Sequence, residues 1–110
     1  MTTTGERWVT VARVGEIARG GLKVVHVDQM PVAIFHLADG YYAIKDVCTH
    51  DGGPVAEGEL DGDVIECPRH GARFNVRTGA VVRLPATTPV LTLPVRVSGE
   101  EIQLDWSEWS

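Results

Sequence analysis

The chain has 110 residues, a length typical of one domain, and 44% of them are hydrophobic, which is enough for one modest core. Its formal net charge is −5, and the acidic residues are spread along the chain instead of being gathered in one tail. This balance argues against nucleic acid as a partner, because phosphate binding requires a concentrated basic face.

Short runs rich in Val, Ile, Leu and aromatic residues alternate with turn signals, and no long segment has the apolar spacing of a helix. The pattern predicts an all-β fold. Turns are expected at Asp39-Gly40, Thr78-Gly79 and Ser98-Gly99, and one helical turn over Val14 to Gly20. The strands are expected, in chain order, at Trp8 to Ala12, Leu22 to Asp28, Val32 to Leu37, Tyr41 to Lys45, Asp63 to Cys67, Ala72 to Val76, Ala80 to Arg83, Leu91 to Val97 and Glu101 to Trp106.

Two segments break the strand pattern. Thr49 to Asp61 is rich in Gly and acidic residues, and Pro68 to Gly71 combines Pro with Gly. Each begins directly after one of the two cysteines of the chain, Cys48 and Cys67. The sequence therefore predicts two loops that carry the reactive side chains, within a single domain that spans residues 1–110.

The N-terminal residues lack the apolar run of a signal peptide, and no later stretch reaches the roughly 18 apolar residues that indicate a membrane span. We expect a cytoplasmic protein without a membrane partner. Because the cytoplasm keeps thiols reduced, two cysteines there favour metal ligands. A disulfide between Cys48 and Cys67 is the alternative.

A constellation of cysteine and histidine occupies the two loops. The sequence reads Cys48-Thr49-His50, then sixteen residues, then Cys67-Pro68-Arg69-His70. Each half offers one thiol and one imidazole that a strand or a tight turn can aim at one point. Thiolate with imidazole selects zinc, iron or an iron-sulfur centre over magnesium or calcium. Structural zinc sites usually group cysteines and histidines separately, so zinc is the weaker alternative.

This pattern resembles the Rieske ferredoxin family, whose motif is Cys-x-His followed, after a similar spacer, by Cys-x-x-His. The resemblance continues through residues 42–47, 60–66 and 78–86. It implies a Rieske iron-sulfur fold, with antiparallel β-sandwich or barrel-like sheets and a small cluster-binding subdomain at about residues 46–86. It also implies one 2Fe-2S cluster, with Cys48 and Cys67 on one iron and His50 and His70 on the other.

The resemblance further implies a monomeric ferredoxin without substrate chemistry of its own. Such a protein receives single electrons from a flavin-dependent reductase and passes them to a terminal oxygenase through transient contacts. An oxygenase catalytic chain is excluded, because only His26 and His36 would remain for its mononuclear iron, which also needs a much larger domain. The alternatives are a small non-catalytic subunit of a nitrite reductase-like complex and a structural zinc-binding domain.

Four positions bear on the reduction potential. High-potential members of the family have a cysteine in each loop that forms a disulfide, and serine and tyrosine hydroxyls that donate hydrogen bonds to the cluster and its ligands. This sequence has Gly53, Arg69, Ala72 and Phe74 at the matching positions. Because such donors stabilise the more negative reduced state, their absence predicts a potential of about −150 mV, at the low end of the Rieske range.

Overall fold

Eleven β-strands and no helix make up the regular structure of residues 8–49, 52–68, 71–84 and 86–105, the parts of the chain that the computed structural model describes. The all-β prediction is confirmed. Those residues accordingly contain no helix of the length and apolarity that crossing a membrane requires. The strands are β1 Trp8–Arg13, β2 Leu22–Val27, β3 Met30–Leu37, β4 Gly40–Lys45, β5 Glu59–Asp61, β6 Val64–Glu66, β7 Arg73–Asn75, β8 Val81–Arg83, β9 Thr92–Leu93, β10 Val95–Ser98 and β11 Glu101–Asp105.

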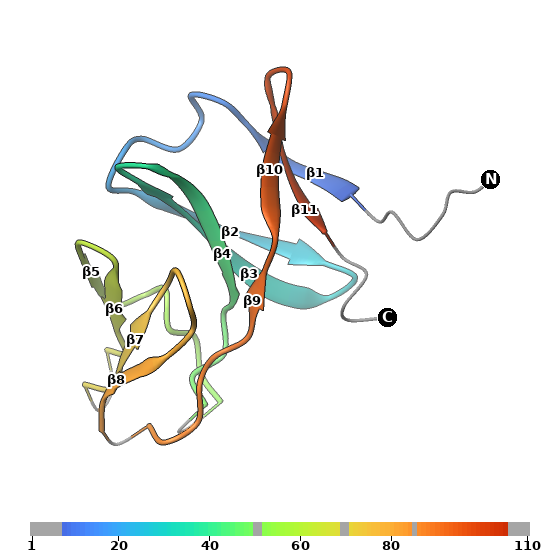
Figure 1. The fold of residues 1–110 in the computed structure, drawn as a ribbon. Coiled ribbons are helices and arrows are strands. Elements are labelled where there is room, and N and C mark those ends of the chain that lie inside the picture. Colours follow the sequence, from blue (N-terminus) through green and yellow to red (C-terminus); the bar gives the residue numbers. More distant parts are fainter. Residues whose placement is uncertain (1–7, 50–51, 69–70, 85, 106–110) are drawn as a thin grey trace.

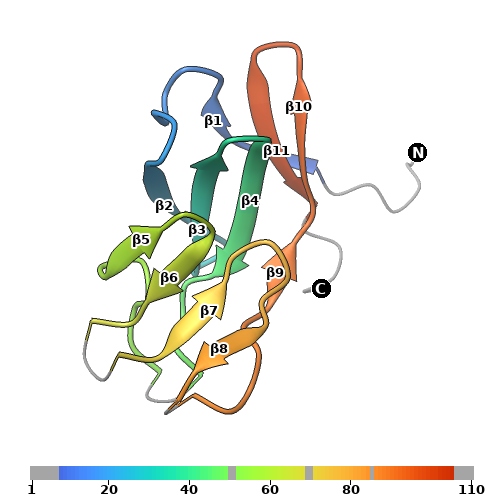
Figure 2. The ribbon, with the colours of Figure 1, turned by 60° about the vertical axis from the view of Figure 1, so that its left-hand side comes forward.

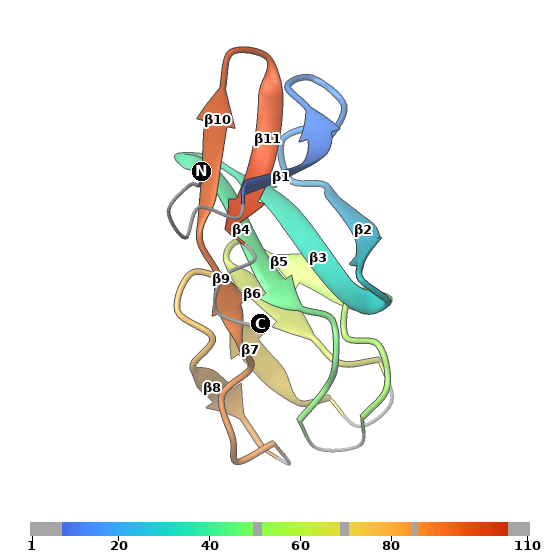
Figure 3. The same cartoon turned by 90° about the vertical axis from the view of Figure 1, so that its right-hand side faces the viewer.

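The strands form three antiparallel sheets (Figure 1). The first has the order β1-β11-β10, the second β2-β3-β4-β9 and the third β5-β6-β7-β8. Figures 1 and 3 show the second sheet between the other two. The fold is therefore layered, and the middle layer is covered on both faces.

The composition of β3 follows from this central place. Side chains alternate between the two faces of a strand, so a strand in a half-exposed sheet alternates apolar with polar residues. In β3, Val32 and Ile34 pack into a core with β11, whereas Ala33 and Phe35 pack into a second core with the third sheet. All four side chains are fully buried. Both faces of β3 are therefore apolar.

The segment Val14 to Gly20 contains no helical turn, so that prediction was wrong. Gly15 and Gly20 have φ angles of 94° and 83°, in the left-handed region that a right-handed helix does not use. Isolated turns replace the helix, with hydrogen bonds from Glu16 N–H to Arg13 O and from Gly21 N–H to Ala18 O.

The number of strands also differs from the prediction, because the described residues form eleven where nine were expected. The run Leu91 to Val97 divides at Pro94 into β9, which pairs with β4, and β10, which pairs with β11. Proline has no N–H to donate to a ladder, which makes it a natural point for the chain to change sheets. In addition, β5 lies within the segment that was predicted to be a loop, where it pairs with β6.

A polar network joins the second and third sheets, whose strands β4 and β7 are both visible in Figure 2. Arg77, which follows β7, donates from Nη1 to Asp39 Oδ2 at 2.6 Å and to the Tyr42 hydroxyl at 2.9 Å. Its Nε donates to Asp63 Oδ2 at 3.2 Å. Asp39 lies in the β3–β4 turn and Asp63 in the β5–β6 turn. One guanidinium therefore bridges carboxylates of two sheets.

This bridge predicts a loss of stability in acid. The hydrogen bond from Arg77 holds the pKa of the Asp39 carboxyl below its usual value. In the unfolded chain, the Asp39 carboxylate takes up a proton at about pH 4, before the carboxylate of the folded protein does. The stabilisation by the Arg77–Asp39 bond is therefore complete above that pH and is lost as the pH falls through the pKa of Asp39 in the folded protein. We expect urea unfolding to show a smaller difference between wild type and Asp39→Asn at pH 3 than at pH 7. An equal difference at both pH values would contradict the assignment.

Candidate metal centre

Cys48 and Cys67 lie in the same buried core although they leave different sheets. Cys48 follows β4 of the second sheet, and Cys67 follows β6 of the third. Each residue is 1% exposed, and both belong to the core that contains Phe35 and Phe74. No disulfide joins the two cysteines, so the disulfide alternative is wrong.

The first loop, residues 48–53, is closed by two backbone hydrogen bonds. The N–H of Cys48 donates to Gly53 O at 2.7 Å, and the carbonyl of Cys48 accepts from Gly52 N–H at 2.7 Å. Gly52 has a φ of 79°, a conformation that glycine adopts without the steric penalty of a Cβ atom. These two bonds therefore hold Gly52 and Gly53 beside the backbone of Cys48.

The second loop, residues 67–72, repeats this closure. The N–H of Cys67 donates to Ala72 O at 2.7 Å, its carbonyl accepts from Gly71 N–H at 3.1 Å, and Gly71 has a φ of 77°. In both loops the cysteine bonds to residues four and five positions ahead. Figures 1 and 3 show the two loops at the same end of the molecule. The fold thus presents two thiols from two similarly closed loops.

The predicted histidine ligands His50 and His70 lie outside the described residues, as does Arg69. Among the residues that are described, no group of three or more His, Cys, Asp or Glu side chains is arranged to hold a metal ion. The structure therefore brings the two cysteines into one core, and the imidazole half of the ligand set stays a prediction.

The other two histidines of the chain have separate places. His26 is exposed on β2, and the residue opposite it on β3 is Pro31. His36 on β3 is half-buried, its Nδ1 lies 2.8 Å from Ile17 O, and its ring stacks on Tyr41 with centroids 4.3 Å apart. These contacts give His36 a structural role in the second sheet.

Sequence reasoning missed two contacts that hold the loops. The Thr49 hydroxyl donates to Thr88 O at 2.6 Å and so ties the first loop to the segment that follows β8. Gly58 lies against the backbone beside Cys67, where an added Cβ would be 1.6 Å from Glu66 O. No sequence signal distinguishes Gly58 from its neighbouring glycines, because the close contact joins the residue before β5 to the last residue of β6.

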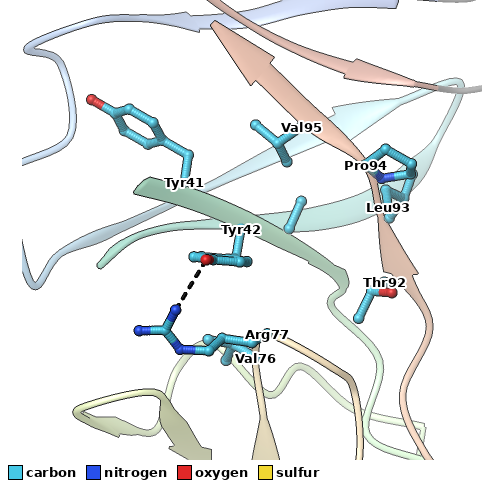
Figure 4. Close-up of a pocket in the computed structure, with 9 residues that line it drawn as sticks. Tyr41, Tyr42, Val76, Arg77, Thr92, Leu93, Pro94 and Val95 are labelled. Carbon is cyan, nitrogen blue, oxygen red and sulfur yellow. Dashed lines mark hydrogen bonds between the residues drawn. The ribbon is translucent and has the colours of Figure 1, made fainter. Parts of the chain in front are cut away.

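A hollow of about 310 Å³ lies elsewhere, between the second sheet and the end of β7 (Figure 4). In this view Tyr42 and Arg77 point toward each other and are hydrogen-bonded, whereas Tyr41 points away from Arg77. Neither cysteine lines this hollow, and two of its lining residues, Tyr42 and Arg77, already take part in the network between the sheets. It is therefore a packing feature and not the metal centre. Its lining consists of Tyr41, Tyr42, Ala43, Val76, Arg77, Thr92, Leu93, Pro94 and Val95.

Comparison with known proteins adds a family and several relatives. The family model described as the Rieske [2Fe-2S] domain matches residues 7–94. Ferredoxin CarAc of Metapseudomonas resinovorans is 40% identical over 96 residues, which cover 86% of this chain and 90% of the relative. The ferredoxin component of the naphthalene 1,2-dioxygenase system of Pseudomonas aeruginosa is 33% identical over 102 residues, which cover 93% of this chain and 98% of the relative.

Solved structures agree with this comparison. A chain in the complex of reduced oxygenase and oxidized ferredoxin in carbazole 1,9a-dioxygenase superposes with a TM-score of 0.84 at 38% identity, covering 89% of this chain and 92% of that chain. The ferredoxin of carbazole 1,9a-dioxygenase from Nocardioides aromaticivorans IC177 has the same TM-score at 35% identity, covering 89% of this chain and 96% of that one.

Proposed function

Because this chain belongs to the Rieske [2Fe-2S] domain family, we propose that it is a ferredoxin that carries single electrons to a terminal oxygenase. Its relatives include the ferredoxin component of a naphthalene dioxygenase system, and a similar chain was solved in complex with an oxygenase. In this proposal the protein is a cytoplasmic monomer, takes its electrons from a flavin-dependent reductase and catalyses no reaction of its own. Both partners bind transiently, as is usual for electron-transfer contacts.

The proposed ligands of its single 2Fe-2S cluster are Cys48, His50, Cys67 and His70. The observation that carries this proposal is the burial of two cysteines in one core, each at the start of a loop that is closed by the same pattern of backbone hydrogen bonds. Two buried thiolates suit the cysteine-held iron of a Rieske cluster. In this proposal the whole chain, residues 1–110, is one domain. Its cluster-binding part spans about residues 46–86.

The fold supplies rigidity and a dry environment for this chemistry. When bound, the cluster accepts and releases one electron. Backbone hydrogen bonds fix the position of Cys48 and Cys67 within their loops, which limits how far either residue moves when the charge changes. The apolar core around both cysteines excludes water from one side of the site. Small structural change between oxidation states favours rapid electron exchange.

Purification from cells supplied with iron and sulfide, without air, tests the cofactor. We expect visible absorption, inorganic sulfide and a rhombic electron paramagnetic resonance signal after reduction with dithionite. A colourless protein that contains zinc would contradict the proposal and favour the structural zinc domain.

The carrier role is then tested by mixing the reduced protein with the terminal oxygenase of a dioxygenase system, where reoxidation of this chain and reduction of the oxygenase should coincide.

The residues next to Cys67 predict a low potential that hydroxyl groups would raise. Ala72 and Phe74 are fully buried, and neither side chain has a donor. We expect a wild-type midpoint of about −150 mV. Ala72→Ser and Phe74→Tyr should each raise it by about 40 mV, if each new hydrogen bond favours the reduced state by about 1 kcal/mol. Spectroelectrochemical titration measures these shifts.

Val76→Thr is the matched control for these variants. Val76 is also fully buried just beyond the end of β7, but it lies two residues beyond Phe74 and farther along the chain from Cys67. Its new hydroxyl should leave the midpoint unchanged. A wild-type midpoint above zero, or equal shifts for Val76→Thr and Ala72→Ser, would overturn the explanation.

A further inference from the structure

Asp46 is the one polar or charged residue that belongs to the buried interior of residues 8–49, 52–68, 71–84 and 86–105. It is 5% exposed and precedes Cys48 by two positions. A buried carboxylate is unfavourable unless hydrogen bonds replace those it made with water. Here Oδ1 accepts from the N–H groups of Val55 at 2.8 Å and Ala56 at 2.7 Å. The Asp46 carboxylate, which precedes the first loop, therefore accepts hydrogen bonds from backbone N–H groups that follow this loop.

The second loop has a ladder of paired strands at its base. Glu66 lies opposite Arg73, and Ile65 lies opposite Phe74, so that β6 and β7 pair up to the residue before Cys67. The second loop is thus the end of a β-hairpin. Strand pairing holds its two ends together without help from a side chain.

The first loop has no ladder at its base. The chain enters it from β4 of the second sheet and continues to β5 of the third sheet, so its two ends belong to different sheets. The Asp46 carboxylate joins them instead. On one side, the Asp46 N–H donates to Pro31 O at 2.9 Å and anchors the residue to β3; on the other, Val55 begins a turn closed by Gly58 N–H to Val55 O at 3.0 Å.

We propose that Asp46 is a positioning residue for the metal centre, because its carboxylate holds the ends of the first loop as the β6–β7 ladder holds those of the second. The inference rests on the proposed function, since it takes Cys48 as a ligand. The two hydrogen bonds to Val55 and Ala56 join the two ends of the segment that carries Cys48 and His50. Without them, the inner bonds of Cys48 and the bond from Thr49 to Thr88 O would still hold the loop, but no bond among the described residues would join the strand end before Cys48 to the turn at Val55.

The test compares Asp46→Ala, which removes the acceptor, with Asp46→Asn, which keeps a side-chain oxygen in the same place. We expect an iron chelator to remove the cluster from Asp46→Ala faster than from wild type by about tenfold or more, the scale on which the loss of a group that orients metal ligands weakens metal binding. Asp46→Asn should behave more like wild type than like Asp46→Ala. The exposed carboxylate of Asp61 on β5 provides the control, and Asp61→Ala should leave the rate unchanged.

The electron paramagnetic resonance spectrum separates positioning from general destabilisation. Asp46→Ala should shift the g values of the reduced cluster, whereas a mutation that only weakens the fold leaves them unchanged. Equal rates of cluster loss for wild type and Asp46→Ala, or for Asp46→Ala and Asp46→Asn, would overturn the proposal, as would unshifted g values.

If Asp46→Ala does not fold, Asp46→Glu carries the test. The longer side chain keeps the charge but displaces the oxygen, so its g values should differ from those of Asp46→Asn, and identical spectra would overturn the inference. The wild-type spectrum distinguishes the two proposals. A wild type without a cluster defeats the proposed function, whereas a wild type with a cluster that is indifferent to Asp46 defeats only this inference.

Discussion

Replacing either His50 or His70 with Ala is expected to abolish the Rieske electron paramagnetic resonance signal. In the proposed ligand set the two imidazoles hold the same iron, so the loss of one leaves that iron with an incomplete set of protein ligands. The measurement is the signal per protein after dithionite reduction, together with the content of iron and inorganic sulfide. Both variants should lose the signal, because the two histidines have equivalent roles.

The chain provides its own control, since it contains four histidines. His26 is exposed on β2, so His26→Ala should retain the full signal. His36 contacts Ile17 O and Tyr41, so His36→Ala should lower the thermal stability and still hold the cluster. A normal signal from His50→Ala or His70→Ala, or its loss in His26→Ala, would refute the ligand assignment.

Gly58→Ala is expected to destabilise the fold by about 3 kcal/mol, the upper part of the range for overpacking a tight site. The added Cβ would lie 1.6 Å from Glu66 O and 2.8 Å from Glu66 C, and both are backbone atoms that a rotamer change does not move. Because Glu66 directly precedes Cys67, relief of the clash displaces the second loop. We therefore expect a lower melting temperature by circular dichroism and less cluster per protein.

Gly15→Ala separates the clash from the general cost of replacing glycine. Gly15 has a φ of 94° and no atom within 4 Å of an added Cβ, so its substitution adds only backbone strain, about 1 kcal/mol. Its melting temperature should fall less than that of Gly58→Ala, and its cluster content should stay normal. Equal effects of the two substitutions would show that the contact with Glu66 does not govern stability.

Much of the strand pattern was predictable, because alternation and turn residues are local signals. The Asp39-Gly40, Thr78-Gly79 and Ser98-Gly99 turns each lie where the structure joins two paired strands. The hairpin between β2 and β3 was less visible, because Asp28 and Gln29 adopt φ values of 54° and 72° without a glycine. The short β5 was missed because its three residues show too little alternation to be recognised alone.

For the candidate site, residue types and spacing pointed to Cys48, His50, Cys67 and His70 and limited the metal to zinc, iron or an iron-sulfur centre. The 2Fe-2S cluster followed from the resemblance to the Rieske ferredoxin family. The network around Arg77 could not be predicted, because Asp39, Asp63 and Tyr42 come from separate turns and strands that only the stacking of the sheets brings together.

The proposed role of Asp46 shows the same limit at the candidate metal centre. In the sequence it is one of fifteen acidic residues, and its position after a strand suggests an exposed side chain. Only the tertiary structure buries it and turns it toward the N–H groups of Val55 and Ala56. Local sequence determined most of the strands and the chemistry of the proposed ligands. The support of the loops depended on hydrogen bonds and close backbone contacts between segments that meet only when the sheets pack.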